Sequence, residues 1–253
     1  MRIDAFSVAL RTLSLLDVVQ TLGVKMMATL MMAFLLVVLA PVTSAADLCP
    51  PTHTGKEWSV QCFEGENDHR RIKSAFIDRV RTNAYGMATI SIDDSPDMPR
   101  EVIAVDGYGN VVIPNIRHTG DFDYPSAYRG LGRFSAVNMD GSGKRVEKCG
   151  YFQSPQFHIL VPAQFDQCEA FAKEGAFACK DCVAYCSNAD CHVREFIGGR
   201  GFVLGTGGTI KREFAVKTLE TYCRRPELVR LKTTNDGTVS IRCDGPGDNP
   251  FVM

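Results

Sequence analysis

Ten cysteines constrain this chain of 253 residues more than any other feature. They all lie beyond position 48, in the part of the sequence that follows an apolar N-terminal run. An even number of cysteines in an exported chain indicates disulfide bonds, which persist in oxidising compartments. The candidate disulfide residues are Cys49, Cys62, Cys149, Cys168, Cys179, Cys182, Cys186, Cys191, Cys223 and Cys243. Their spacing alone allows too many connectivities to select one, so any pairing must be argued from proximity along the predicted strands.

The N-terminal region predicts export. Residues 26–46 are almost entirely apolar, then end in Pro41 and several small residues before Asp47. This is the pattern of a signal peptide, with cleavage after Ala45 or Ala46. We therefore expect residues 1–46 to be removed and the mature chain to be periplasmic or secreted, with no membrane contact after cleavage. The alternative is an uncleaved anchor helix, although the run over 28–40 is shorter than the roughly 20 apolar residues that a bilayer requires.

Charge and composition exclude some partners. The formal net charge is −1, and hydrophobic and charged residues make up 45% and 23% of the chain. These values are typical of a globular protein. Because there is no basic excess, we expect neither nucleic acid nor an anionic membrane surface as a partner.

Internal similarity organises the middle of the chain. Gly86, Gly130 and Gly175 open three similar segments and are spaced 44 and 45 residues apart. Strand-like segments ending in Pro114 and Pro162 precede two of them. The pattern predicts a hairpin whose second strand ends at the proline, which donates no ladder hydrogen bond, followed by a third strand opened by glycine. Each unit is too small to bury its own apolar face, so neighbouring units must stack.

These segments resemble the WG repeat of bacterial proteins. The resemblance is carried by Cys149-Gly150-Tyr151, by Val161-Pro162, and by the Phe, Glu and Gly residues up to Gly175. It extends over roughly residues 58–179, and the signature tryptophan is replaced by Cys149 and Val102. A WG repeat implies a β-rich repeat architecture, and the family has no single activity that could be carried over.

The pattern stops after Cys179, and the remaining segments predict a cap. A glycine-rich strand pair is expected over 196–209, a short helix over 211–223, and a hairpin with strands at 228–232 and 238–243. The predicted fold is all-β with a minor helix. It consists of serial three-stranded WG-like units over 47–194 and a β-rich C-terminal cap over 195–253.

Proximity along these elements predicts the disulfide pairs. Cys223 is expected to pair with Cys243, Cys49 with Cys62, and Cys149 with Cys168. Four cysteines then remain to pair among themselves, namely Cys179, Cys182, Cys186 and Cys191. The same four, with His192, are the weak candidates for a zinc site. A redox-active Cys179–Cys182 pair would need a βαβ setting, which this sequence does not offer.

No other motif predicts catalysis or a cofactor. The glycine-rich segments 198–201 and 205–209 lack the ending of a phosphate loop, so they predict turns. The acidic groups Asp93, Asp94, Asp97, Asp121 and Asp123 match no calcium loop and are expected to be solvated. Four arginines at corresponding strand ends are likewise expected to face solvent, namely Arg79, Arg81, Arg129 and Arg133.

The sequence thus favours a non-enzymatic exported interaction protein of the bacterial envelope. Its stacked β units would present a surface to a protein, peptide or glycan. The alternative is a secreted or periplasmic hydrolase with an active site built from the loops at 114–130 and 196–209.

Overall fold

The computed structural model describes residues 48–65, 69–95, 100–118, 120, 122–139, 141–187, 191, 193–223, 225–233 and 239–244. All of them belong to one compact unit, Ala46–Met253. The predicted signal peptide lies outside the described residues, as do Asp97, Asp121 and His192. Among the residues described, no helix is long and apolar enough to cross a membrane.

Strands dominate the described chain, which confirms the expected all-β class. The strands are β1 (Phe63–Glu64), β2 (Arg71–Ile72), β3 (Met87–Ile92), β4 (Glu101–Asp106), β5 (Val111–Ile113), β6 (Leu131–Met139), β7 (Arg145–Gln153), β8 (His158–Phe165), β9 (Gln167–Cys168), β10 (Ala176–Lys180), β11 (Val183–Cys186), β12 (Arg194–Ile197), β13 (Arg200–Leu204), β14 (Ile210–Ala215), β15 (Val229–Thr233) and β16 (Val239–Cys243). The described helical segments are the short α3 (Leu219–Tyr222) and the 3-10 turns η1 (Thr52–Thr54), η2 (Val60–Cys62), η4 (Ser74–Arg79), η5 (Tyr128–Gly130) and η6 (Pro226–Leu228).

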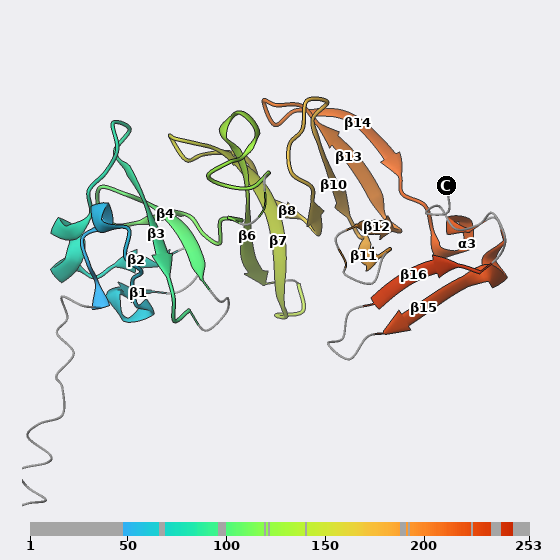
Figure 1. Ribbon diagram of the computed structural model, residues 1–253, viewed down its shortest axis with the longest axis horizontal. Helices are drawn as coiled ribbons and strands as arrows, with labels where there is room; N and C mark the ends of the chain where they lie inside the picture. Colours follow the sequence, from blue (N-terminus) through green and yellow to red (C-terminus); the bar gives the residue numbers. More distant parts are fainter. Residues whose placement is uncertain are drawn as a thin grey trace, which may run out of the picture. The chain divides into compact units, whose positions relative to one another are not determined.

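Three sheets repeat one arrangement, and their strands follow one another in Figure 1 from green to orange. They are β3–β4–β5, β6–β7–β8 and the meander β10–β13–β14, to which β9 adds at the β10 edge. The first strand of each directly follows one of the three predicted glycines. Gly86, Gly130 and Gly175 have φ of 74°, 74° and 126°, a left-handed conformation that side chains disfavour. The expectation that these glycines open strands at equivalent positions is confirmed.

The register also repeats, although the predicted unit is displaced by one strand. Ala104 pairs with Ile113, and Tyr151 pairs with Val161, one residue before Pro114 and Pro162 respectively. The glycine strand, however, pairs with the hairpin that follows it and not with the one that precedes it. Each sheet therefore begins with its glycine strand, so the predicted order within a unit was wrong.

The expectation that the strand ends at Pro162 was also wrong. Pro114 follows the end of β5 as predicted, but Pro162 lies inside β8, which continues to Phe165. Between the pairs Cys149↔Phe165 and Tyr151↔Val161, one residue of β7 faces three of β8. Pro162 is tolerated there because it sits at this irregularity on an edge strand, where its missing N–H breaks no ladder.

The pattern does not stop at Cys179, as we had expected. β13 pairs with β10, and Gly201 and Phe202 take the positions that Gly150 and Tyr151 occupy in the preceding sheet. The hairpin β11–β12 is inserted between β10 and β13. The predicted boundary at 194/195 falls within this insertion, and the sheet continues across it.

Two predicted elements of the C-terminal region also change. The segment 196–209 does not form a strand pair, because β12 pairs with β11 whereas β13 pairs with β10 and β14. Residues 210–215 form β14 instead of helix, and only 219–222 are α-helical. Pairing of Phe214 and Arg212 with β13 overrides the helix propensity of this charged segment. The predicted final hairpin is present as β15–β16, and its turn lies outside the described residues.

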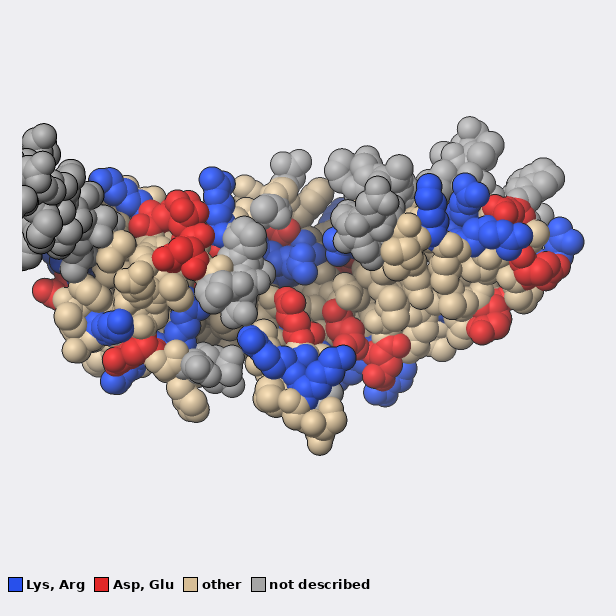
Figure 2. All heavy atoms as spheres, turned by 90° about the horizontal axis from the view of Figure 1, so that it is seen from below, with Lys and Arg blue, Asp and Glu red and all other residues tan. Residues whose placement is uncertain are grey.

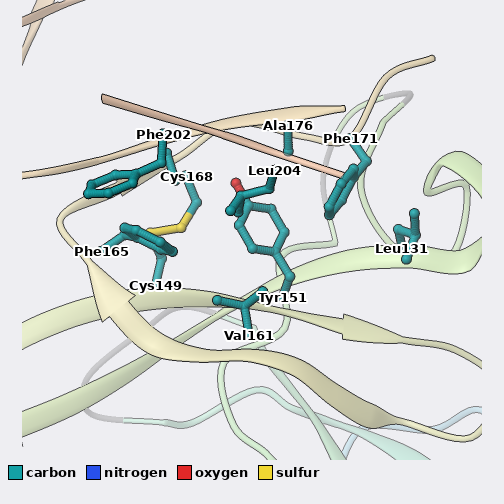
Figure 3. Packing of buried hydrophobic residues seen from close by; sticks show 11 residues of the cluster. Leu131, Cys149, Tyr151, Val161, Phe165, Cys168, Phe171, Ala176, Phe202 and Leu204 are labelled. Carbon is teal, nitrogen blue, oxygen red and sulfur yellow. A yellow bond between two sulfur atoms is a disulfide. The ribbon is translucent and has the colours of Figure 1, made fainter. Parts of the chain in front are cut away.

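The second and third repeats share a core, shown in Figure 3. Tyr151 is fully buried there, between Val161, Leu204 and Phe171, and its hydroxyl donates to the carbonyl oxygens of Glu169 and Phe177 at 2.9 and 3.1 Å. Burial raises the pKa of the Tyr151 phenol well above its usual value, which keeps the hydroxyl protonated and able to donate.

Five disulfides bridge all ten cysteines: Cys49–Cys62, Cys149–Cys168, Cys179–Cys182, Cys186–Cys191 and Cys223–Cys243. Three of these bonds are the predicted pairs Cys49–Cys62, Cys149–Cys168 and Cys223–Cys243, and the four remaining cysteines pair among themselves as expected. The Cys149–Cys168 bond lies beside Phe165 and Phe202 in the shared core. Because disulfides persist in oxidising surroundings, the folded chain belongs outside the cytoplasm.

Candidate functional site

The cysteine-rich connector forms disulfides and not a metal centre. Cys179 is bonded to Cys182, and Cys186 to Cys191, so their thiolates are not free to bind zinc. His192, the fifth member of the predicted cluster, lies outside the described residues. Within the described ranges, no group of three or more His, Cys, Asp or Glu side chains is placed to hold a metal ion.

Two of the residues expected to face solvent are buried together. The Asp123 carboxylate accepts two hydrogen bonds from the Arg133 guanidinium, at 2.8 and 2.6 Å. Their side chains are only 8% and 14% exposed. Arg133 also donates to the carbonyl oxygen of Cys168 at 2.7 Å. The expectation of a solvated acid and a solvent-facing arginine was therefore wrong here, because the pair ties the 114–130 segment to β6 and to β9.

The loops proposed for a hydrolase do not bring a nucleophile and a base together in the described structure. In 114–130, Asp123 is engaged by Arg133, and the His118 ring nitrogen Nε2 lies 2.8 Å from the carbonyl oxygen of Arg100. The segment 196–209 contains no carboxylate, histidine, serine or cysteine. General acid–base catalysis requires such groups within hydrogen-bond reach of a reacting atom.

The third sheet instead carries an aromatic groove on its outer face. Ala178, Phe202 and Leu204 point into the shared core. Side chains alternate along a strand, so Phe177 of β10 and Phe214 of β14 lie on the opposite face. Gly201 lies between them. A Cβ on Gly201 would be 2.7 Å from Phe214 and 3.0 Å from Phe177, which shows that both rings rest on the bare backbone at this position.

The inserted hairpin completes the groove. Phe196 of β12 lies with its ring centroid 5.1 Å from that of Phe177, and Phe177 and Phe214 are 6.1 Å apart. The three rings are half-buried and adjoin an open hollow of about 620 Å³. We call this hollow the Phe177 groove, and it is lined by Glu169, Phe177, Arg194, Glu195, Phe196, Phe214, Ala215, Val216 and Lys217.

Four charged side chains surround the rings, two of each sign: Glu169, Arg194, Glu195 and Lys217. None of these side chains forms an ion pair or a hydrogen bond with another residue that the structure describes. Charged side chains that lack partners among the described residues, beside half-buried aromatic rings, are available to a ligand. Elsewhere, acidic and basic residues are interspersed over the face that Figure 2 presents.

Two further hollows lack the combination of aromatic rings and charges of both signs found at the Phe177 groove. One of about 370 Å³ lies between β5 and β8 and is lined mainly by apolar side chains such as Val112, Phe134 and Ile159. Another, of about 290 Å³, lies near Thr52, Arg81 and Phe157. The contacting rings of Tyr124 and Phe157 also line the second hollow, but no acidic residue lies among its lining residues, so it lacks the charges of both signs found at the Phe177 groove.

Sequence reasoning did not identify the Phe177 groove. Its three rings come from β10, β12 and β14, and only strand pairing across the insertion brings them together. The available signal was Gly201, whose position matches Gly150 once the insertion is recognised. Comparison of the chain with protein-family models, with curated proteins and with solved structures gave no match.

Proposed function

We propose that this chain is a non-enzymatic binding protein of the bacterial envelope, with the Phe177 groove as its recognition surface. The observation that carries the proposal is the combination of three half-buried phenylalanine rings with four charged side chains that lack partners among the described residues. Protein interfaces commonly have an aromatic centre surrounded by a polar rim, and the aromatic residues there supply much of the binding energy.

The proposed location is the periplasm or the exterior, reached through the signal peptide at residues 1–46. The apolar run before Asp47 and the disulfide-rich mature chain support this route. The intact mass of the protein from cell fractions provides the test. We expect a mature chain starting at Ala46 or Asp47. A membrane-bound form that retains residues 26–45 would show that this segment is a membrane anchor and not a signal peptide.

We also propose that the three repeated sheets are degenerate WG repeats. The shared strand register supports this assignment, as do the recurring glycine and proline positions. In such an array the third repeat has diverged by inserting β11–β12, and that insertion supplies Phe196 to the groove.

Capture from an envelope extract tests the binding function. The mature protein is immobilised in wild-type form, as Phe196→Ala, and as Tyr108→Ala. Tyr108 is the matched control because it is 81% exposed and lies in the β4–β5 turn of the first repeat, outside the groove. We expect Phe196→Ala to reduce the captured partner at least tenfold and Tyr108→Ala to leave it unchanged.

Two outcomes would contradict the proposal. Equal capture by both variants would show that the groove is not the recognition surface. Turnover of ester, peptide or glycoside substrates by the pure protein would favour the hydrolase alternative over a binding protein.

A further inference from the structure

Within the described ranges, the β14 strand has a hydrogen-bonding partner on one side only. It is the terminal strand in the order β14–β13–β10–β9. The carbonyl oxygens of Phe177 and Cys179 accept hydrogen bonds from Glu169 and Asp166, so these two residues direct their backbone groups toward β9. In an antiparallel ladder the direction alternates from residue to residue and from strand to strand. The residues of β10 that bond to β13 are therefore those on either side of Cys179.

This alternation identifies the free groups on β14. Gly201 and Val203 direct their backbone groups toward Phe214 and Arg212, with which they pair. The N–H of Val216, which donates to the carbonyl oxygen of Gly199 at 3.1 Å, follows the same alternation. The N–H and C=O groups of Glu213 and Ala215 consequently point away from the sheet. No residue in the described part of the chain bonds to them.

The free edge continues into the Phe177 groove. Ala215 belongs to both, and Val216 and Lys217 extend the same strand along the wall of the groove. A polypeptide segment paired with Glu213 and Ala215 would project alternate side chains toward the face that carries Phe214. Edge pairing supplies main-chain hydrogen bonds and an adjacent pocket selects a side chain, which is a recurring mode of peptide recognition.

The charges along this edge indicate which sign of charge the partner carries. Lys211, Arg212 and Lys217 are exposed and form no ion pair with a described residue, whereas Glu213 is paired with Arg200 at 3.1 Å. The free edge is therefore basic through Lys211 and Arg212, and Lys217 is shared with the groove, where it and Arg194 balance Glu169 and Glu195. Like charges also oppose pairing of β14 with a second copy of itself, and they attract a segment rich in aspartate or glutamate.

We propose that the partner is an extended, acidic polypeptide segment that adds to β14 as a further strand and inserts one apolar side chain into the Phe177 groove. The inference rests on the proposed function and narrows its partner from protein, peptide or glycan to a peptide segment of stated chemistry. A glycan would use the rings and the charged rim but would leave the backbone groups of Glu213 and Ala215 without partners.

The experiment uses peptides selected from a random library of 12-residue sequences displayed on phage and panned on the wild-type mature protein. We expect the selected sequences to contain an apolar residue flanked by acidic residues. Affinities of synthetic versions are measured for wild type, Ala215→Pro and Ala215→Thr. Proline removes the outward N–H at an edge position that tolerates it, and threonine keeps that N–H.

We expect Ala215→Pro to weaken binding at least tenfold relative to Ala215→Thr, which keeps the outward N–H at the same position. Equal unfolding midpoints of the two variants establish that both are folded. Hydrogen exchange gives a readout independent of affinity. On peptide binding, the amide hydrogens of Glu213 and Ala215 should become protected, because they enter a new ladder.

Three results would overturn the inference. Equal affinity of the proline and threonine variants would exclude edge pairing. Groove-dependent binding to a glycan array without peptide selection would refute the peptide partner and leave the binding function intact. A dimer in sedimentation experiments that Ala215→Pro dissociates would assign the edge to a second copy of the chain. A different result would contradict the proposed function itself, namely capture of equal amounts of partner from the envelope extract by Phe196→Ala and Tyr108→Ala.

Discussion

Gly150 on β7 is in direct contact with the backbone of Pro162 on β8. A Cβ on Gly150 would lie 2.8 Å from the carbonyl carbon of Pro162 and 2.8 Å from the nitrogen of Ala163, and closer still to the carbonyl oxygen of Val161. The glycine thus permits the irregular pairing in which one residue of β7 faces three of β8. This contact explains in physical terms why a glycine stands opposite Pro162 in the second repeat.

Replacement of Gly150 by alanine should therefore destabilise the protein strongly. The atoms in the way belong to the backbone and cannot rotate aside, so β8 must shift. We expect a loss of about 2 kcal/mol in the free energy of unfolding, within the range for overpacking of an interior. Urea denaturation of the disulfide-intact protein measures it.

Gly141→Ala is the matched control. A Cβ at Gly141 meets no atom within 4 Å, and its φ lies outside the left-handed region. We expect a change of less than about 0.5 kcal/mol, as for ordinary surface substitutions. Equal stability of the two variants would show that β7 and β8 do not approach as closely as the structure indicates.

Features that depend on residues close in sequence could be predicted from the sequence. The spacing of Gly86, Gly130 and Gly175 identified the strand starts, because each requires a backbone conformation that glycine adopts easily. Three of the five cysteine pairs were also accessible, because each joins positions close in sequence. The longest separation is 20 residues, between Cys223 and Cys243.

Non-local pairing was not accessible. The third repeat was missed because its second strand follows an insertion, so Gly201 pairs with Cys179 across the β11–β12 hairpin. Burial of Asp123 was missed for a similar reason. A lone acidic residue in a loop predicts solvation unless a cation such as Arg133 is known to be packed against it. The Phe177 groove was missed for the first reason, because its three rings come from β10, β12 and β14.

Removal of the Cys149–Cys168 disulfide should destabilise the second and third repeats. The bond closes a separation of 19 residues and lies within the core that they share. The double replacement by serine should cost about 3 kcal/mol in the chain-entropy model. Thermal unfolding measured by circular dichroism detects the loss.

The Cys186–Cys191 bond provides the comparison, because it closes a separation of only 5 residues. Its double replacement by serine should cost about 2 kcal/mol in the same model. If the two double variants were equally stable, loop length and core position would not determine the contribution of these bonds.

Asp123→Asn should be more damaging than its conservative shape suggests. It leaves the Arg133 guanidinium buried without its counter-charge, at 14% exposure. Loss of one member of a buried pair costs about 3–5 kcal/mol. The comparison is Glu64→Gln, which removes the ion pair between Glu64 (43% exposed) and Arg71 (61% exposed). Because this pair lies at the surface, its loss should cost less than about 1 kcal/mol in the free energy of unfolding. Comparable losses for both variants, measured by urea denaturation, would contradict the burial of the Asp123–Arg133 pair.

The last prediction concerns pH. Burial alone would raise the pKa of the Asp94 carboxyl, but hydrogen bonds from the Ser59 hydroxyl and the Val60 N–H, at 2.7 and 2.5 Å, outweigh it and lower that pKa. A carboxyl whose pKa is lowered by folding stabilises the native state above its unfolded pKa. That contribution is lost as the pH falls through the lower, folded pKa.

Ser59→Ala should therefore raise the pKa of Asp94 toward its usual value and make the protein more sensitive to acid. Carbon-detected NMR titration of the Asp94 carboxyl measures the first effect, and the midpoint of acid unfolding measures the second. Ser59→Thr keeps the hydroxyl and should retain the lowered pKa. If alanine and threonine gave the same titration curve for Asp94, the hydrogen bond from Ser59 would not be the cause of its lowered pKa.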